Sequence, residues 1–159
     1  MGIAPLDLQT ARTGDWVSLK NWGHVTILVV KGQGTDGDDQ TFTFEQATSV
    51  SGTAKNLSTI DEYWEKEENA ANLEATGVWT RVTQTAAATV APGDPSAQSA
   101  ALYIFEIDAA DLDVANGYDC IRISNDGAGS NAQLGTAIYI LSEPRYPQAP
   151  QNLANAIID

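Results

Sequence analysis

Three glycines with the spacing GxGxxG follow an apolar run and are a candidate phosphate-binding turn. They are Gly32, Gly34 and Gly37. This spacing binds a dinucleotide when the third glycine opens a helix whose N-terminus faces the pyrophosphate. Here the segment after Gly37 alternates between polar and apolar residues from Thr41 onward, which predicts a strand. We therefore interpret the glycine-rich segment as a hairpin connection between two strands.

Three aspartates in the same segment are candidate oxygen ligands for calcium. They are Asp36, Asp38 and Asp39. Their negative charges would repel the phosphates of a nucleotide. In a calcium-binding loop that starts at Asp36, the sixth position should be Gly and the twelfth Glu, whereas this chain has Thr41 and Ala47 there. A calcium site between Asp36 and Asp39 therefore stays a minor alternative.

Residues for nucleophilic or metal-assisted catalysis are scarce. His24 is the sole histidine and Cys120 the sole cysteine. The chain therefore cannot form a zinc site with several His ligands, and a catalytic triad would have only His24 as its base. Cys120 lies in the run "YDCIRIS", where a small buried thiol is the ordinary interpretation. Paired carboxylates for glycoside hydrolysis stay open among the 21 Asp and Glu residues, although no pair stands out. We therefore expect that the protein is not an enzyme and binds neither a cofactor nor a metal ion.

Aromatic and acidic residues suggest binding surfaces instead. The four tryptophans that could stack against sugars are Trp16, Trp22, Trp64 and Trp79. Half-buried packing within strands is their more common role. The acidic run is interpreted as a solvated face or a strand edge, because crowded like charges repel each other and keep edges from pairing. Its members are Asp61, Glu62, Glu65, Glu67 and Glu68.

Charge and hydropathy exclude two classes of partner. The formal net charge is -13 with only 8 Lys and Arg residues, which argues against nucleic acid because phosphate binding requires clustered cations. No apolar run approaches the roughly 20 residues that a membrane span needs. The first residues also lack the basic start and apolar core of a signal peptide.

Short segments with two-residue alternation, separated by turn residues, predict an all-β fold with about eight strands. The expected strands are a short one from residue 15, then 24–31, 41–50, 58–67, 78–85, 101–109, 118–124 and 134–143. No long helix is predicted. This pattern favours an antiparallel β-sandwich of jelly-roll-like type.

The domain is expected to span residues 15–142. Residues 1–14 show no sustained period and are expected to form an extended N-terminal arm. Residues 143–159 are expected to form a tail, because their prolines cannot donate to a β-ladder. These prolines are Pro144, Pro147 and Pro150. A chain of 159 residues fits one domain with short arms.

Three stretches of the chain resemble a family of small β-rich proteins. They are "LKNWGHVTILVVKGQGTDG", "LYIFEIDAADLDVANGYDCIRIS" and "AIYILSEPRYPQAP". The motifs "KNWGHVT", "DLD" followed by "NGYD", and "EPRYP" recur in this order. The family is encoded in the head-gene modules of tailed bacteriophages, and its members are commonly regarded as head decoration or capsid cement proteins. The resemblance extends from Leu19 to Pro150, and residues 49–100 match only as a variable region.

The resemblance implies a non-enzymatic virion protein on the outer surface of the capsid, made in the host cytoplasm. Its partner would be the major capsid protein where neighbouring capsomers meet. The resemblance also implies self-association around local symmetry axes, for which a trimer is one arrangement. Binding to the expanded shell alone would stabilise that shell by mass action.

The arms are the expected interface, because segments that order on binding cover large surfaces and aromatic or Arg anchors carry much of the binding energy. The residues expected to contact the capsid or a neighbouring subunit are Leu6, Leu8, Trp16, Trp22, Arg145, Tyr146, Leu153 and Ile157. Packing onto the domain's own surface is an alternative of equal weight. This hypothesis predicts an arm that orders only on assembly and no ligand pocket.

Two other classes stay open. A carbohydrate- or receptor-binding β-module of a virion or tail would present exposed, coplanar tryptophan rings. A small hydrolase would have a cleft with two carboxylates at one of the separations that glycosidases use.

Overall fold

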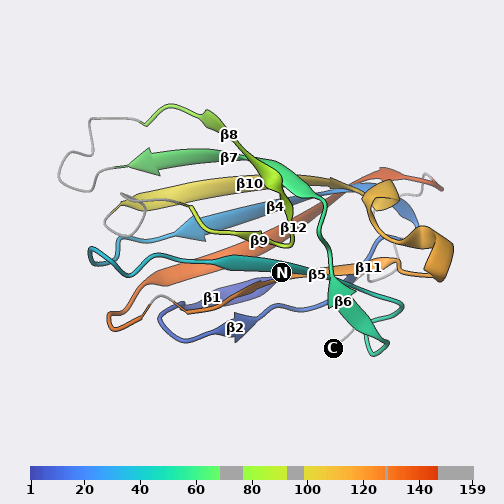
Figure 1. The fold of residues 1–159 in the computed structure, drawn as a ribbon, viewed down its shortest axis with the longest axis horizontal. Helices are drawn as coiled ribbons and strands as arrows, with labels where there is room; N and C mark the ends of the chain where they lie inside the picture. Colours follow the sequence, from blue (N-terminus) through green and yellow to red (C-terminus); the bar gives the residue numbers. More distant parts are fainter. Residues whose placement is uncertain (69–76, 93–98, 128, 147–159) are drawn as a thin grey trace.

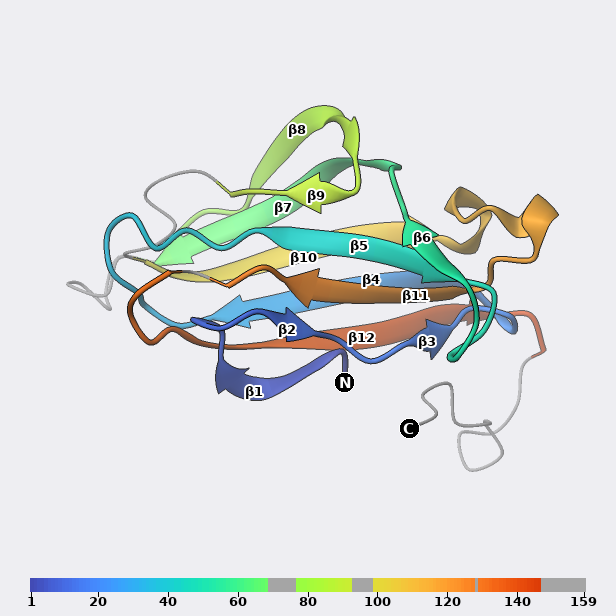
Figure 2. The ribbon, with the colours of Figure 1, turned by 60° about the horizontal axis from the view of Figure 1, so that its bottom comes forward.

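Two antiparallel β-sheets pack face to face in this protein (Figures 1 and 2). The computed structural model describes residues 1–68, 77–92, 99–127 and 129–146. Within these residues the chain forms twelve strands and two short 3-10 helices, η1 (Ala109–Asp111) and η2 (Val114–Asn116). The predicted antiparallel β-sandwich is therefore confirmed.

The first sheet, sheet A, contains the long strands of the chain. Its strand order is β1 (Ile3–Asp7), β12 (Leu134–Pro144), β4 (Trp22–Lys31), β10 (Ala100–Asp108), β7 (Ile60–Glu68) and β8 (Thr80–Ala87). β4 is rich in β-branched residues and alternates, with Val25, Ile27 and Val29 buried against the second sheet.

The second sheet, sheet B, is built from shorter strands. Its order is β2 (Arg12–Thr13), β11 (Cys120–Asn125), β5 (Phe42–Ala47) and β6 (Ala54–Asn56), while β3 (Val17–Ser18) pairs with β11 and β9 (Thr89–Val90) pairs with β5. The predicted number of strands was wrong, because twelve are present instead of about eight. β2, β6 and β9 have only two or three residues, too few to show alternation, and the register of β1 shifts around Pro5.

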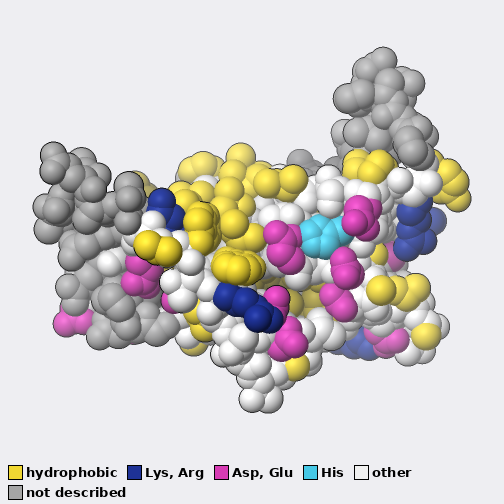
Figure 3. Space-filling model, turned by 90° about the horizontal axis from the view of Figure 1, so that it is seen from above, with side chains coloured by type: hydrophobic (Ala, Val, Ile, Leu, Met, Phe, Trp, Pro, Cys, Tyr) yellow, Lys and Arg dark blue, Asp and Glu magenta, His cyan; other side chains and the backbone are white. Residues whose placement is uncertain are grey.

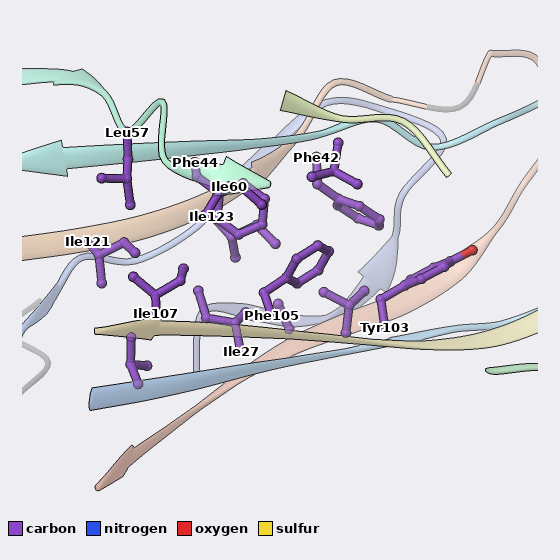
Figure 4. Close-up of a cluster of buried hydrophobic side chains, with 14 of the residues drawn as sticks. Ile27, Phe42, Phe44, Leu57, Ile60, Tyr103, Phe105, Ile107, Ile121 and Ile123 are labelled. Atoms are coloured by element: carbon purple, nitrogen blue, oxygen red, sulfur yellow. The ribbon is translucent and has the colours of Figure 1, made fainter. Parts of the chain in front are cut away.

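The core between the sheets is filled by aromatic and branched side chains (Figure 4). The rings of Phe44 on β5 and Phe105 on β10 meet edge to face, with centroids 4.8 Å apart. The rings of Phe42 and Tyr103 are tilted relative to each other, with centroids 5.7 Å apart. Such pairs contribute about 0.5–1.5 kcal/mol each beyond the apolar area that they bury. The core therefore depends on contacts between β5 and β10, which belong to different sheets.

The first fourteen residues belong to the sandwich and do not form a separate arm. Gly2 donates a backbone hydrogen bond to the carbonyl of Ala137 and accepts one from Asp15. Ile3 and Leu8 are buried in the core, and Leu8 is only 1% exposed. These side chains fill part of the gap between the sheets, and β1 and β2 pair with β12 and β11. The segment is therefore ordered in the isolated chain. This differs from the expected arm that orders only on assembly.

The last strand runs past the expected domain boundary at residue 142. β12 continues through Pro144, which is paired with Trp22, and the backbone N–H of Arg145 then donates to the carbonyl of Asn21. Pro144 is tolerated because it stands at the strand end, where its missing N–H costs no ladder bond. Residues 147–159 lie outside the described residues, and with them most of the predicted tail, including Leu153 and Ile157.

Candidate functional site

The glycine-rich segment connects β4 to β5, and a strand follows it as predicted. The hairpin interpretation was wrong, because β4 belongs to sheet A and β5 to sheet B, so the segment passes from one sheet to the other. Asp38 within this segment accepts hydrogen bonds from the backbone of Ser130 and from the backbone and side chain of Asn131. These bonds hold the pKa of Asp38 below its usual range. The carboxylate considered for calcium therefore joins two loops. In the described residues no group of three or more His, Cys, Asp or Glu side chains is placed to hold a metal ion.

The sole histidine and the sole cysteine have structural partners. His24 lies on the outward side of β4, with Nε2 3.1 Å from Glu106 Oε2 and Nδ1 3.1 Å from the hydroxyl of Ser142. Cys120 is buried, and burial together with the Asp119 carboxylate raises the pKa of its thiol to about 12. A thiol with this pKa is not a nucleophile at neutral pH, because the thiolate is the reactive form.

The acidic run lies on β7, which pairs with both β10 and β8 and is not an edge. The strand-edge interpretation was therefore wrong. Asp61 and Glu62 are exposed, and the guanidinium of Arg81 donates to Glu62. Glu65 is partly buried, and burial raises its pKa, with a further contribution from the charge of Glu67.

The tryptophans lie in different parts of the structure. The ring of Trp16 stacks with the guanidinium of Arg122, 4.3 Å away, on the outer side of sheet B. Trp64 lies on the outer side of sheet A and is 39% exposed. Trp22 packs against the margin of the core. Trp16 and Trp64 therefore cannot belong to one sugar-stacking platform.

The predicted interface residues are not brought together as one surface. Leu6 is exposed on the edge strand β1, whereas Leu8 is in the core. Arg145 and Tyr146 are exposed beyond the end of β12. For Leu8 the structure supports the alternative of packing within the domain.

The outward side of sheet A carries a continuous band of apolar side chains that the sequence analysis missed. Cross-strand neighbours in one row are Ile138, Leu28, Ile104 and Trp64, from β12, β4, β10 and β7 in turn. Val30 and Leu102 lie side by side in the next row, and Ile140 on β12 extends the band. We call these seven residues the apolar face.

The apolar face is accessible to solvent and has a charged border. Its side chains are partly exposed, and Ile140 is 50% exposed. Figure 3 shows hydrophobic side chains gathered on this side of the molecule, beside acidic side chains that surround the histidine. The border includes Glu106, which accepts a hydrogen bond from Thr26, and Asp108, which is paired with His24 in the ladder.

The outward side of sheet B is polar by contrast. Arg122 donates to Glu45 at 2.7 Å, and Thr43 donates to Asp126. An antiparallel sheet that faces water on one side normally carries polar residues there, as sheet B does. A contiguous exposed apolar patch marks a surface that another molecule covers. The difference between the two sheets therefore makes the apolar face the candidate functional site.

The three stretches that carry the family resemblance meet at this site. They contain β4, β10 and β12, which are adjacent strands in sheet A although they are far apart in the sequence. The sequence signal related to the site is the near-continuous apolar run in each strand, as in "VTILVV" of β4, although the runs do not show which strands become neighbours. A run of this kind indicates a strand with apolar residues on both sides of the sheet.

Comparison with known proteins adds no assignment. No family model, no curated protein and no solved structure matches the chain. Among the described residues, the structure has no helix with the length and apolarity required to cross a bilayer.

Proposed function

We propose that this protein is a head decoration protein of a tailed bacteriophage. It would bind the outer surface of the capsid without catalysis and stabilise the expanded head by bridging major capsid protein subunits. The observation that carries the proposal is the apolar face, because six of its seven residues lie on the three strands of the family-like stretches and only Trp64 lies on β7. The family resemblance supplies the class of partner, and the apolar face supplies a means of binding it.

A broad apolar sheet face is suited to covering a joint between subunits. Removing apolar surface from water contributes roughly 25 cal/mol per Å², and this contribution does not depend on direction. A specific protein interface usually buries about 800 Å² on each partner, which requires a face rather than a cleft. A subunit that binds only the expanded shell shifts the equilibrium toward it by the difference in affinity.

The charge of the chain indicates what the capsid surface should look like. The net charge is -13, and Glu62, Glu106 and Asp108 lie on the same side of sheet A as the apolar face. A complementary surface would be apolar in its centre and would carry Lys or Arg at its border. Such complementarity would steer the encounter and would weaken at high salt.

Co-sedimentation with phage heads tests the function. Purified protein is mixed with heads of its own phage that have been stripped of accessory proteins, and occupancy is measured from gel band ratios. We expect saturation at a fixed ratio to the major capsid protein. Absence of binding at micromolar protein concentrations would overturn the proposal.

A charge placed in the apolar face tests the surface. Ile104→Glu should weaken binding by tenfold or more, because the interface would bury a carboxylate without a partner. A tenfold loss of affinity corresponds to about 1.4 kcal/mol of binding free energy. The matched control is Ala54→Glu, which adds the same charge at an exposed position on β6 of sheet B. If both variants bind like the wild type, the function stands but the apolar face is not the docking surface.

A further inference from the structure

A pocket of about 190 Å³ is lined in part by Ala109 of η1 and Val114 of η2. These two short helices lie at one end of the sandwich (Figure 1). The lining residues include Leu19, Ala109, Val114 and Tyr118, together with the cationic residues Lys20 and Arg145. Asp119 also lines the pocket, and its carboxylate accepts a hydrogen bond from the thiol of Cys120. None of these residues belongs to the apolar face. The pocket is smaller than the 300–1,000 Å³ typical of small-molecule sites, and it is of a size for one side chain.

Hydrogen bonds of the backbone hold the walls of the pocket in place. Leu19 N–H donates to the carbonyl of Asp119 at 2.7 Å, which ties the segment before β4 to the segment before β11. Gly117 adopts a left-handed φ of 83° and donates to the carbonyl of Val114 at 3.0 Å, which ends η2. Arg145 is fixed by its backbone bond to Asn21. The pocket is therefore formed by the fold itself.

The motifs singled out in the sequence converge on this pocket. Lys20 begins "KNWGHVT", Tyr118 lies in "NGYD", and Arg145 lies in "EPRYP". These three residues are distant in the sequence and lie outside the apolar face, and only Arg145 was expected from the sequence to contact a partner. Their meeting at one cavity is a property of the fold that the separate motifs did not reveal.

Two cations at the pocket have no ion-pair or hydrogen-bond partner among the residues that the structure describes. Most cationic side chains of the chain have a partner, as in the pairs Lys55–Asp113 and Arg122–Glu45. Within the described residues, neither the Lys20 ammonium nor the Arg145 guanidinium makes an ion pair or a hydrogen bond. With 21 acidic residues against 8 Lys and Arg, two unpaired cations at one pocket point to an anionic ligand.

We propose that the pocket binds an acidic peptide segment of a partner protein. An apolar side chain of that segment enters the pocket, and a carboxylate next to it pairs with Lys20 and Arg145. The planar guanidinium of an Arg matches a carboxylate with two parallel hydrogen bonds, which makes this contact specific as well as favourable. Interface hot spots are enriched in Arg and cluster in well-packed pockets.

Peptide titration of the ¹⁵N-labelled full chain, followed by NMR, tests this site. The probe is the peptide acetyl-Ala-Leu-Glu-Ala-amide, and the matched probe replaces its Glu with Gln. We expect the acidic peptide to shift the amide signals of Leu19, Val114 and Tyr118, and to bind about fivefold or more tightly than the neutral one, as expected for a charge-assisted hydrogen bond.

Paired variants separate the site from overall charge. Lys20→Gln with Arg145→Gln should remove the preference for the acidic peptide. Lys66→Gln with Arg81→Gln changes the net charge equally and should keep it. Thermal unfolding of both double variants establishes that they are folded.

Three results would each overturn the proposal. The two peptides could bind with equal affinity, or the pocket signals could fail to shift at a peptide concentration on the order of 10 mM. The double variant at Lys20 and Arg145 could also keep the preference for the acidic peptide. None of these results depends on binding to phage heads.

Discussion

The hydroxyl of Tyr139, on β12 of sheet A, accepts a hydrogen bond of 3.0 Å from the backbone N–H of Ile123, on β11 of sheet B. The same hydroxyl donates to the carbonyl of Asp15 at 3.0 Å. Burial raises the pKa of Tyr139, so the phenol stays protonated and can act as donor and acceptor at once. One side chain therefore joins both sheets and the segment between β2 and β3.

Removal of this hydroxyl tests how much the link stabilises the sandwich. Tyr139→Phe leaves the N–H of Ile123 without its acceptor and should lower the free energy of unfolding by about 1–3 kcal/mol. Urea unfolding measures the change. Tyr146→Phe is the control, because Tyr146 is 70% exposed and its change should stay within about 0.5 kcal/mol. Equal stability of the two variants would show that the link contributes nothing measurable.

The thiol of Cys120 should react slowly in the folded protein. Its pKa of about 12 leaves almost no thiolate at pH 8, and the side chain is only 2% exposed. We expect an aromatic disulfide reagent to label Cys120 within seconds in guanidinium chloride and far more slowly in buffer. Rapid labelling in buffer would contradict the described burial.

The ammonium of Lys31 gives a prediction about pH. Lys31 is buried and donates to the carbonyl of Ser99, and burial lowers its pKa from 10.5 to about 8, against the opposing charges of Glu67 and Asp39. Between these two pH values the unfolded chain binds a proton that the folded chain does not. Stability therefore rises with pH in this window.

The variant Lys31→Met isolates the contribution of Lys31 to the pH dependence of stability, because the wild type and the variant have all other titrating groups in common. The free energy of unfolding of the wild type minus that of the variant should increase between pH 8 and 10 by up to about 1.4 kcal/mol per pH unit. Urea unfolding at pH 7, 8, 9 and 10 measures it. A difference that is constant with pH would mean that Lys31 keeps its proton in the folded state.

The carboxylate of Asp38 should stabilise the protein only while it is ionised. Its pKa is held below the ordinary value of 3.8, first by the bond from the Asn131 side chain and then by the backbone of Ser130. This contribution is present above pH 3.8 and is lost as the pH falls through the lower folded pKa. Asp38→Asn should be less stable at pH 7, and its stability should depend less on pH below 3.8. Unfolding curves at pH 2, 3, 4 and 7 provide the test.

The alternation of single strands was enough to predict most of sheet A. In β10, Tyr103 and Phe105 are buried and alternate with partly exposed Leu102 and Ile104, as a two-residue period requires. Neighbours across strands were not predictable, because the contact between Ile104 and Leu28 depends on register and not on any local pattern. The apolar face consists of such contacts, and this is why the sequence did not reveal it.

The N-terminal segment shows a second limit of sequence patterns. Leu6 and Leu8 are two positions apart, so a two-residue period predicts the same burial for both leucines. Leu6 is nevertheless exposed, whereas Leu8 is buried. The difference arises because β1 ends at Asp7 and the chain turns at Leu8 and Gln9, so Leu8 no longer follows the alternation of the strand. The pocket was likewise out of reach, because Lys20 and Arg145 become neighbours only through the pairing of β4 with β12.

The position of β1 and β2 also decides when the protein can fold during translation. The carboxylate of Asp7 accepts a hydrogen bond from the backbone of Gln133, a residue 126 positions later, and within the described part of the chain β1 pairs with β12 alone. The first strands must therefore wait until nearly all of the described chain has left the ribosome. Non-local pairing of this kind slows folding and leaves strand edges open to neighbouring nascent chains. A slower rate of synthesis should consequently do little for the yield of folded protein, whereas a lower concentration of nascent chains should raise it.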